Sequence, residues 1–184
     1  SRSFLLPFPS MKIKIVNDTV ASSVKEHPEK LTGFSVLNPT ADDALEEVER
    51  IVSLGLKGVM LDPEFHSVFR HQAKVEELMV PCMDNNLPVL FNTPNIEVGE
   101  GARMGREPYY NGLKNLAFKF PDVRFVVSPY WPRIKVLMIK YSNIFIDSGG
   151  RNGISGAVRL MTDIGPTRVC FGSESPQNHP GLGV

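Results

Sequence analysis

Short apolar runs rich in β-branched residues recur along the chain, at intervals of roughly 20 to 35 residues. Most of them are continuous rather than alternating, which is typical of strands buried on both faces of a parallel sheet. They predict a sheet of about seven strands. The runs that we interpret as strands cover residues 4–6, 34–37, 58–61, 88–91, 123–127, 143–146 and 169–171.

Between these runs lie segments whose apolar residues recur every three or four positions. In residues 41–55 the stripe is formed by Leu45, Val48 and Ile51, as expected for a helix that buries one face. Strands and helices therefore alternate, and no linker or low-complexity stretch interrupts them, which predicts a single α/β domain over residues 1–184. The other helical segments are expected within residues 73–86, 136–141 and 154–164.

Nearly every predicted strand runs into a polar or Gly/Pro-rich cluster. The clusters read LNPT, LDPEFH, FNTPN, SPYWP, DSGGRNG and GSESPQNHPG. In a (β/α) barrel the loops after the strands build the active face, so this pattern favours a TIM-like parallel barrel. A dinucleotide-binding sheet would instead need a glycine-rich turn after an early strand, and the sequence has none.

Composition adds few constraints to this picture. Twenty basic residues balance twenty acidic ones, which argues against nucleic acid or an anionic membrane as a partner. No apolar run is long enough to span a bilayer. Cys82 and Cys170 lie in apolar contexts without metal-type spacing, so we interpret them as reduced thiols of a cytoplasmic protein.

The segments at the strand ends resemble the amidohydrolase-related family of the metal-dependent hydrolase superfamily. GLKGVMLDPEF is similar to the family's fourth strand, LPVLFNTP to the fifth, FPDVRFVVSPYW to the sixth, NIFIDSGG to the seventh and GPTRVCFGSESP to the eighth. The resemblance implies an α/β barrel that is incomplete, because strand one and the last helix have no counterpart here. Open strand edges at residues 3–7 and 169–172 would then need cover. We expect it from a second copy in a homo-oligomer, from parts outside this sequence or from residues 11–16 as an extra strand.

The family's metal ligands are mostly replaced in this chain. The resemblance places Asn92 at the histidine of strand five, Pro129 (or Ser128) at that of strand six, and Glu174 at the aspartate of strand eight. An amide is a poor transition-metal ligand and proline is none. We therefore predict no cofactor and no tightly bound metal.

The resemblance also suggests which residues form the site. Glu174 is the candidate base for water and Asp62, which replaces a family histidine, is the second catalytic candidate. The loop of residues 96–112 is interpreted as a lid whose arginines hold a substrate carboxylate, or as a plain surface insertion. The substrate-binding candidates are Asn92, Arg103, Arg106, Trp131, Asp147 and Arg151.

Several alternatives stay open at this point. Asp147 is equally a turn former before Gly149, and Glu174 is equally a cap of the following helix. His66 and His179 are expected to be solvated loop residues, although with Asp62 and Glu174 they could assemble a zinc site. The predicted function is a hydrolase or lyase acting on a small carboxylated or lactone substrate. The alternative is a non-catalytic barrel that binds a small molecule or a partner chain.

Overall fold

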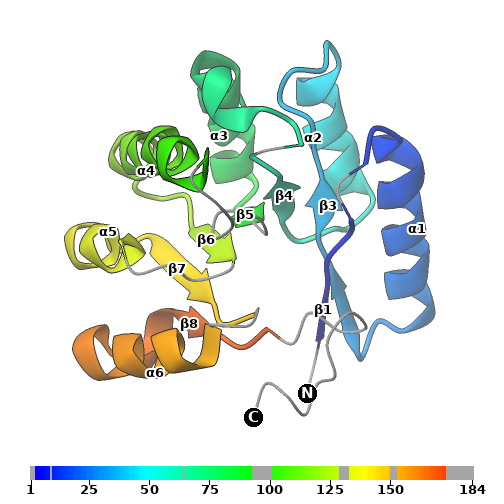
Figure 1. Cartoon of the computed structure of the whole chain (residues 1–184). Coiled ribbons are helices and arrows are strands. Elements are labelled where there is room, and N and C mark those ends of the chain that lie inside the picture. Colours follow the sequence, from blue (N-terminus) through cyan, green and yellow to red (C-terminus); the bar gives the residue numbers. More distant parts are fainter. Residues whose placement is uncertain are drawn as a thin grey trace. The chain divides into compact units, whose positions relative to one another are not determined.

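The computed structural model describes residues 3–8, 10–63, 65–92, 101–128, 133–149 and 153–172 (Figure 1). The chain divides into two compact units, Ser1–Leu90 and Phe91–Val184. Each unit contains strands followed by helices, as the sequence predicts.

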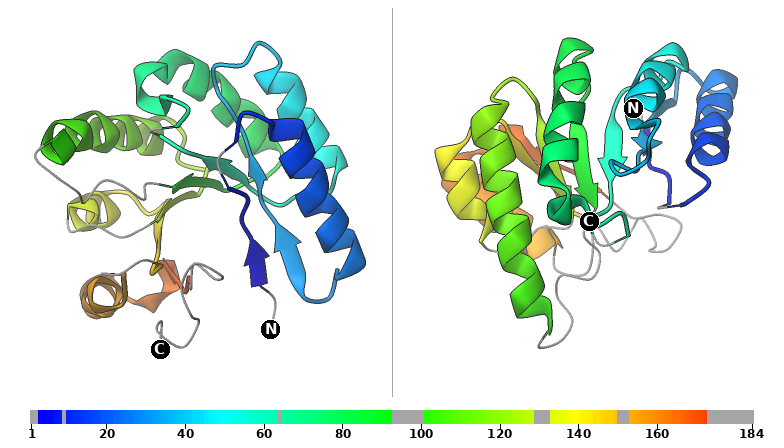
Figure 2. Two further views of the ribbon diagram at one scale, coloured as in Figure 1. Left: turned by 45° about the vertical axis from the view of Figure 1, so that its right-hand side comes forward. Right: turned by 90° about the horizontal axis from the view of Figure 1, so that it is seen from above.

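The first unit alternates short strands with longer helices. Strands β1 and β2 pair in parallel, with Phe4 opposite Thr32, and β3 pairs in parallel with β4, with Ser35 opposite Val59. The helices of this unit lie outside its strands (Figure 2). Its elements are β1 (Ser3–Leu5), α1 (Ile13–Glu26), β2 (Leu31–Gly33), β3 (Ser35–Val36), α2 (Ala44–Ser53), β4 (Val59–Leu61), a 3-10 turn (Val68–Arg70), α3 (Gln72–Asp84) and the start of β5 (Val89–Asn92).

The helical stripe of α2 is rotated from its predicted position. Val48 and Ile51 are fully buried as predicted, but Leu45 is half-exposed and Glu47 is buried in its place. The exchange is possible because Glu47 accepts two hydrogen bonds from Arg50, at 2.8 and 2.9 Å. A buried carboxylate satisfied in this way is tolerated on an apolar face.

The prediction of an extra strand at residues 11–16 is wrong. These residues alternate polar and apolar side chains, but helix α1 begins at Ile13 and continues to Glu26. Its buried positions are Asn17 and Val20, three apart, which is a helical spacing. The alternation covers only residues 11–16, and the residues up to Glu26 continue the helix.

Asn17 takes the place of a neighbouring strand beside β3. Its Oδ1 accepts the Val36 N–H at 2.8 Å, and its Nδ2 donates to the Val36 carbonyl oxygen at 3.0 Å. On the other side, the flanking amides of Ser35 and Leu37 donate to the carbonyl oxygens of Gly58, just before β4, and of Met60 within it. Because β1 ends at Leu5, this side chain satisfies the backbone of Val36 on a side where none of the described strands pairs with it.

The second unit repeats the strand–helix alternation. Strand β6 pairs in parallel with β7, and β7 with β8, while the helices lie on one side of these strands (Figure 1). Phe91 stacks on Phe125 with ring centroids 6.1 Å apart, which anchors the end of β5 in the core. The elements are α4 (Gly101–Lys119), β6 (Phe125–Ser128), α5 (Ile134–Lys140), β7 (Ile144–Asp147), α6 (Gly153–Ile164), a 3-10 turn (Pro166–Arg168) and β8 (Val169–Cys170).

The interpretation of residues 96–112 as a loop is wrong from Gly101 onward. Helix α4 runs from Gly101 to Lys119 with Pro108 inside it. Tyr109, which lies inside the segment interpreted as a lid or surface insertion, is 2% exposed and contacts the Phe91 ring edge-on. The glycines and the proline suggested a loop, but the apolar residues that follow continue the helix.

The strands are arranged in chain order, from β3 through β4 to β5 and from β5 through β6 and β7 to β8. Parallel strands in chain order, each followed by a helix, form a TIM-barrel-like α/β fold, which confirms the predicted fold class. Among the described strands β1 and β8 each have one strand neighbour, and β1–β2 form a separate pair. The predicted cover of these edges therefore stays a prediction. None of the described helices has the length and apolar character needed to cross a membrane.

Candidate functional site

Three of the predicted site residues lie at the carboxyl ends of strands. Asp62 directly follows β4, Asn92 ends β5 and Asp147 ends β7. Arg103 and Arg106 belong to helix α4 rather than to a lid loop. The remaining candidates lie outside the described residues, as does His179; they are Trp131, Arg151 and Glu174.

Asp147 is a buried carboxylate with defined partners. It is 8% exposed. Its Oδ2 accepts a hydrogen bond from the Ser128 hydroxyl at 3.0 Å, and its Oδ1 accepts one from the Gly149 N–H at 2.9 Å. Burial raises the pKa of Asp147, although both hydrogen bonds favour the ionised form. The turn-forming interpretation is confirmed by the bond from the Gly149 N–H, and the role of Asp147 in substrate binding stays a prediction.

The backbone after β8 passes close against Asp147. A Cβ atom at Gly172 would lie 1.9 Å from Asp147 Oδ1, so only glycine allows this approach. The Gly172 N–H also bonds to the Ser148 hydroxyl at 3.3 Å. Glycine at this position signalled a strand end in the sequence, but its contact with Asp147 had no sequence signal.

Two of the positions that the resemblance assigns to metal ligands lie in the described part of the chain, and neither carries a good transition-metal ligand. Asn92 offers an amide, and Ser128, at the end of β6, directs its hydroxyl to Asp147. Neither group is a good ligand for zinc or iron. Within the described part of the chain, no three His, Cys, Asp or Glu side chains are grouped to hold a metal ion. Because Pro129 and Glu174 are not among the described residues, the predicted lack of tight metal binding stays a prediction.

A second polar cluster follows β4 in the first unit. Asp62 is 4% exposed and its Oδ1 accepts the Phe65 N–H at 2.8 Å, while its carbonyl oxygen accepts the His66 N–H at 3.0 Å. This turn holds the His66 ring next to the Phe65 ring, edge-on at 4.9 Å between centroids. The turn therefore brings a carboxylate, an imidazole and an aromatic ring to one strand end.

The prediction that His66 is a solvated loop residue is wrong. Its exposure is 4%, and neither ring nitrogen has a hydrogen-bond partner among the described residues. Burial lowers the pKa of His66; the nearby backbone of Ser10 and the charge of Asp62 oppose this shift. His66 follows the residues Asp-Pro-Glu-Phe, a polar, turn-like stretch that is typical of an exposed loop, so the local sequence did not indicate its burial.

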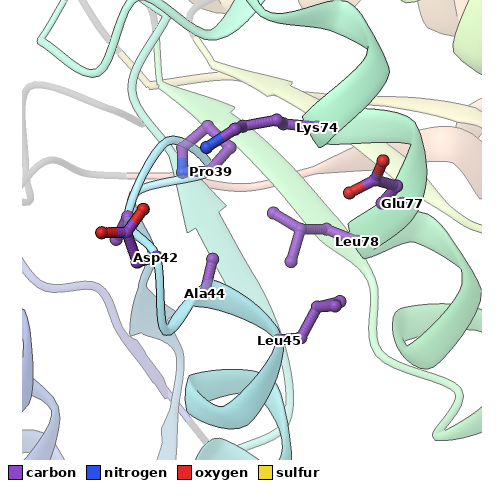
Figure 3. A pocket seen from close by; sticks show the side chains of 8 residues that line it. Pro39, Asp42, Ala44, Leu45, Lys74, Glu77 and Leu78 are labelled. Carbon is purple, nitrogen blue, oxygen red and sulfur yellow. The ribbon is translucent and has the colours of Figure 1, made fainter.

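A shallow pocket of about 140 Å³ lies between the start of α2 and the helix α3 (Figure 3). Leu45 and Leu78 form its apolar part, and Lys74 donates to the Thr40 carbonyl oxygen at 3.3 Å. No residue predicted for the site lines this pocket.

Comparison with known protein families agrees with the resemblance seen in the sequence. Residues 13–183 match the sequence profile of the family described as Amidohydrolase. Searching curated protein sequences gave no significant match.

Solved structures with a similar fold include several decarboxylases. The 5-carboxyvanillate decarboxylase of Sphingomonas paucimobilis aligns with a TM-score of 0.69 at 15% identity, over 92% of this chain and 64% of its own. The 2,6-dihydroxybenzoate decarboxylase from Rhizobium aligns with a TM-score of 0.66 at 14% identity, over 93% of this chain and 68% of its own.

The 5-carboxyvanillate decarboxylase of Novosphingobium aromaticivorans, solved with bound manganese, has a TM-score of 0.71 at 14% identity, over 99% of this chain and 69% of its own. At these identities the likeness establishes the fold. The chain spans about two thirds of the length of these enzymes.

Proposed function

Because the chain belongs to the amidohydrolase family, we propose that it is a hydrolase or lyase acting on a small carboxylated or lactone substrate, without a tightly bound metal. The names of the structural neighbours support the substrate class, since those enzymes act on 5-carboxyvanillate and 2,6-dihydroxybenzoate. The replaced ligand positions Asn92 and Ser128 support the second part.

The observation that carries this proposal is the environment of Asp147. A carboxyl group at a strand end, buried and with a raised pKa, keeps its proton to higher pH than a solvated aspartate does, which suits it to hold or deliver a proton. The Ser128 hydroxyl and the Gly149 N–H fix both of its oxygens, so the acid is positioned without a metal.

Glu174 is the proposed base. For a lactone, its carboxylate takes a proton from water while the water oxygen attacks the carbonyl carbon, and the ring C–O bond breaks. The leaving oxygen then takes a proton, which a protonated Asp147 supplies. In a decarboxylation the C–C bond breaks instead, and the ring carbon that keeps the electron pair takes the proton.

Substrate binding is proposed for the remaining candidates, with Asp62 as a further acid–base group. Arginine is well suited to a carboxylate because its guanidinium donates two parallel hydrogen bonds. The proposed substrate-binding residues are Asn92, Arg103, Arg106, Trp131 and Arg151.

Two conservative variants test the proposal. Glu174→Gln and Asp147→Asn retain shape but remove a proton acceptor or donor, so turnover of a hydroxybenzoate or lactone panel should fall about 100-fold or more. Asp122→Asn, which changes an exposed aspartate of the same unit, should leave turnover unchanged. Full activity of both site variants would refute the assigned roles.

The alternative is a non-catalytic barrel that binds a small molecule or a partner chain. Two residues favour it: the resemblance places Asn92 at one family histidine and Pro129 or Ser128 at another, and the Ser128 hydroxyl is already hydrogen-bonded to Asp147. In that case calorimetry should detect binding of a carboxylated ligand, while neither wild type nor variants turn it over. Measurable turnover by wild type that Glu174→Gln abolishes would exclude this alternative.

A further inference from the structure

The cluster after β4 contains polar atoms that its own structure leaves without partners. Both His66 ring nitrogens are buried and lack hydrogen bonds among the described residues. The Ser10 backbone is near enough to favour the protonated ring, but it does not meet hydrogen-bond geometry. Leaving a buried imidazole without hydrogen bonds is unfavourable. We therefore expect a group that is not among the described residues to form a hydrogen bond with the His66 ring.

The chemistry of this cluster restricts what that group is. A neutral imidazole offers one donor and one acceptor. A hydroxyl both accepts and donates, so it pairs with either nitrogen, whereas a carboxylate can only accept. Asp62, whose charge acts on the same ring, also disfavours a second anion. The cluster therefore suits a hydroxyl better than a carboxylate.

The neighbouring side chain adds an aromatic surface. The Phe65 ring is 51% exposed and stands edge-on to the His66 ring at 4.9 Å. It is the outer member of the pair, and an exposed side chain of this kind changes rotamer within nanoseconds. An aromatic ligand can pack against Phe65 while its hydroxyl reaches His66.

We propose that His66, with Phe65 and Asp62, binds the phenolic hydroxyl of an aromatic ligand. This inference rests on the proposed function in one respect, namely that the ligand is a small aromatic acid whose carboxylate is held elsewhere. It makes His66 a specificity-determining residue that selects hydroxylated over plain benzoates. The selection comes from completing the hydrogen bonds of a buried ring.

The test measures hydroxyl preference by calorimetry. For wild type, 2,6-dihydroxybenzoate should bind about 5- to 10-fold more tightly than benzoate, the range expected for one or two hydrogen bonds. In His66→Phe, which keeps a ring but removes both nitrogens, the ratio should fall to about one with benzoate affinity unchanged. His27→Phe makes the same change at an exposed histidine and should keep the ratio.

A second measurement uses wild-type protein with labelled histidines and phenol as the probe. Phenol should shift the ring nitrogen signals of His66 and leave those of His27 unmoved. Unmoved His66 signals, no binding of either benzoate, or an unchanged ratio in His66→Phe would each overturn the inference. If the ratio falls as expected while no variant or wild type shows turnover, the inference stands and the proposed catalysis fails.

Discussion

Asn17→Asp changes one atom of a fully buried side chain. In the native protein the Asn17 amide nitrogen donates to the Val36 carbonyl oxygen at 3.0 Å and to Glu47 Oε1 at 2.8 Å. An aspartate offers oxygen at that place, so both acceptors lose their donor and two carboxylates face each other. The bond from the Val36 N–H at 2.8 Å is retained.

The size of the effect follows from these contacts. A buried carbonyl oxygen left without a donor costs about 1 to 3 kcal/mol, and like charges in a buried site add to this cost. We expect a loss of about 3 to 5 kcal/mol in the free energy of unfolding. Domains of this kind have about 5 to 15 kcal/mol in total, so the variant should be folded but markedly less stable.

Urea unfolding monitored by circular dichroism measures this loss. With a slope of about 2 kcal/mol per molar urea, the midpoint should fall by about 1.5 to 2.5 M. Asn85→Asp is the matched control, because the exposed Asn85 donates to the Pro81 carbonyl oxygen at 2.9 Å and its loss should cost less than about 1 kcal/mol. If the midpoints of Asn17→Asp and of the control differ by less than about 0.3 M, the two variants have similar stability, and the role assigned to Asn17 is refuted.

Three further predictions follow from the described contacts. Gly172→Ala should displace Asp147, because the new Cβ would lie 1.9 Å from its Oδ1; turnover should fall with it, and unchanged turnover would contradict the proposed acid. Burial raises the pKa of Cys82 to about 12 and also raises that of Cys170, but only Cys170 is exposed, so mass spectrometry should find iodoacetamide at pH 8 on Cys170 first and on Cys82 only in urea; equal labelling of both without urea would contradict the burial of Cys82. Burial lowers the pKa of His66 from 6.5, so the unfolded chain binds a proton more readily than the folded one. The free energy of unfolding should therefore fall as the pH drops below about 6.5. In urea unfolding at several pH values, His66→Phe should weaken this pH dependence; an unchanged pH dependence would assign it to other groups.

The sequence predicted the strands well because burial on both faces leaves a clear signal. The run 88–91 became β5 and the run 143–146 became β7 with a shift of one residue. Strand β2 was missed, since its residues Leu-Thr-Gly are too few and too polar to stand out. Short segments of this kind are held by their partners rather than by their own composition.

The polar contacts could not be predicted, because they join residues far apart in the sequence. Asn17 lies outside every element that the sequence predicted, yet its side chain pairs with the backbone of Val36. Asn143 similarly donates to the carbonyl oxygens of Phe120 and Val123, each at 3.0 Å. A buried amide is visible only when the tertiary partners are known.

For the candidate site, the positions at strand ends could be predicted from the sequence, but the contacts between distant segments could not. Asp62, Asn92 and Asp147 do stand at strand ends, because the polar residue that follows a buried apolar run marks the carboxyl end of a strand. The Ser128 contact with Asp147 and the burial of His66 depend on the packing between segments. Roles for Glu174, Arg151 and Trp131 remain predictions.

Metal content and activity after chelation test the central claim most directly. Protein purified without chelators should contain less than about one tenth of an equivalent of zinc, manganese or iron, because Asn92 and Ser128 are poor ligands. Its turnover of a hydroxybenzoate or lactone substrate should be the same before and after treatment with EDTA, and should require Glu174. Stoichiometric metal, or activity that EDTA abolishes and zinc or manganese restores, would contradict the account.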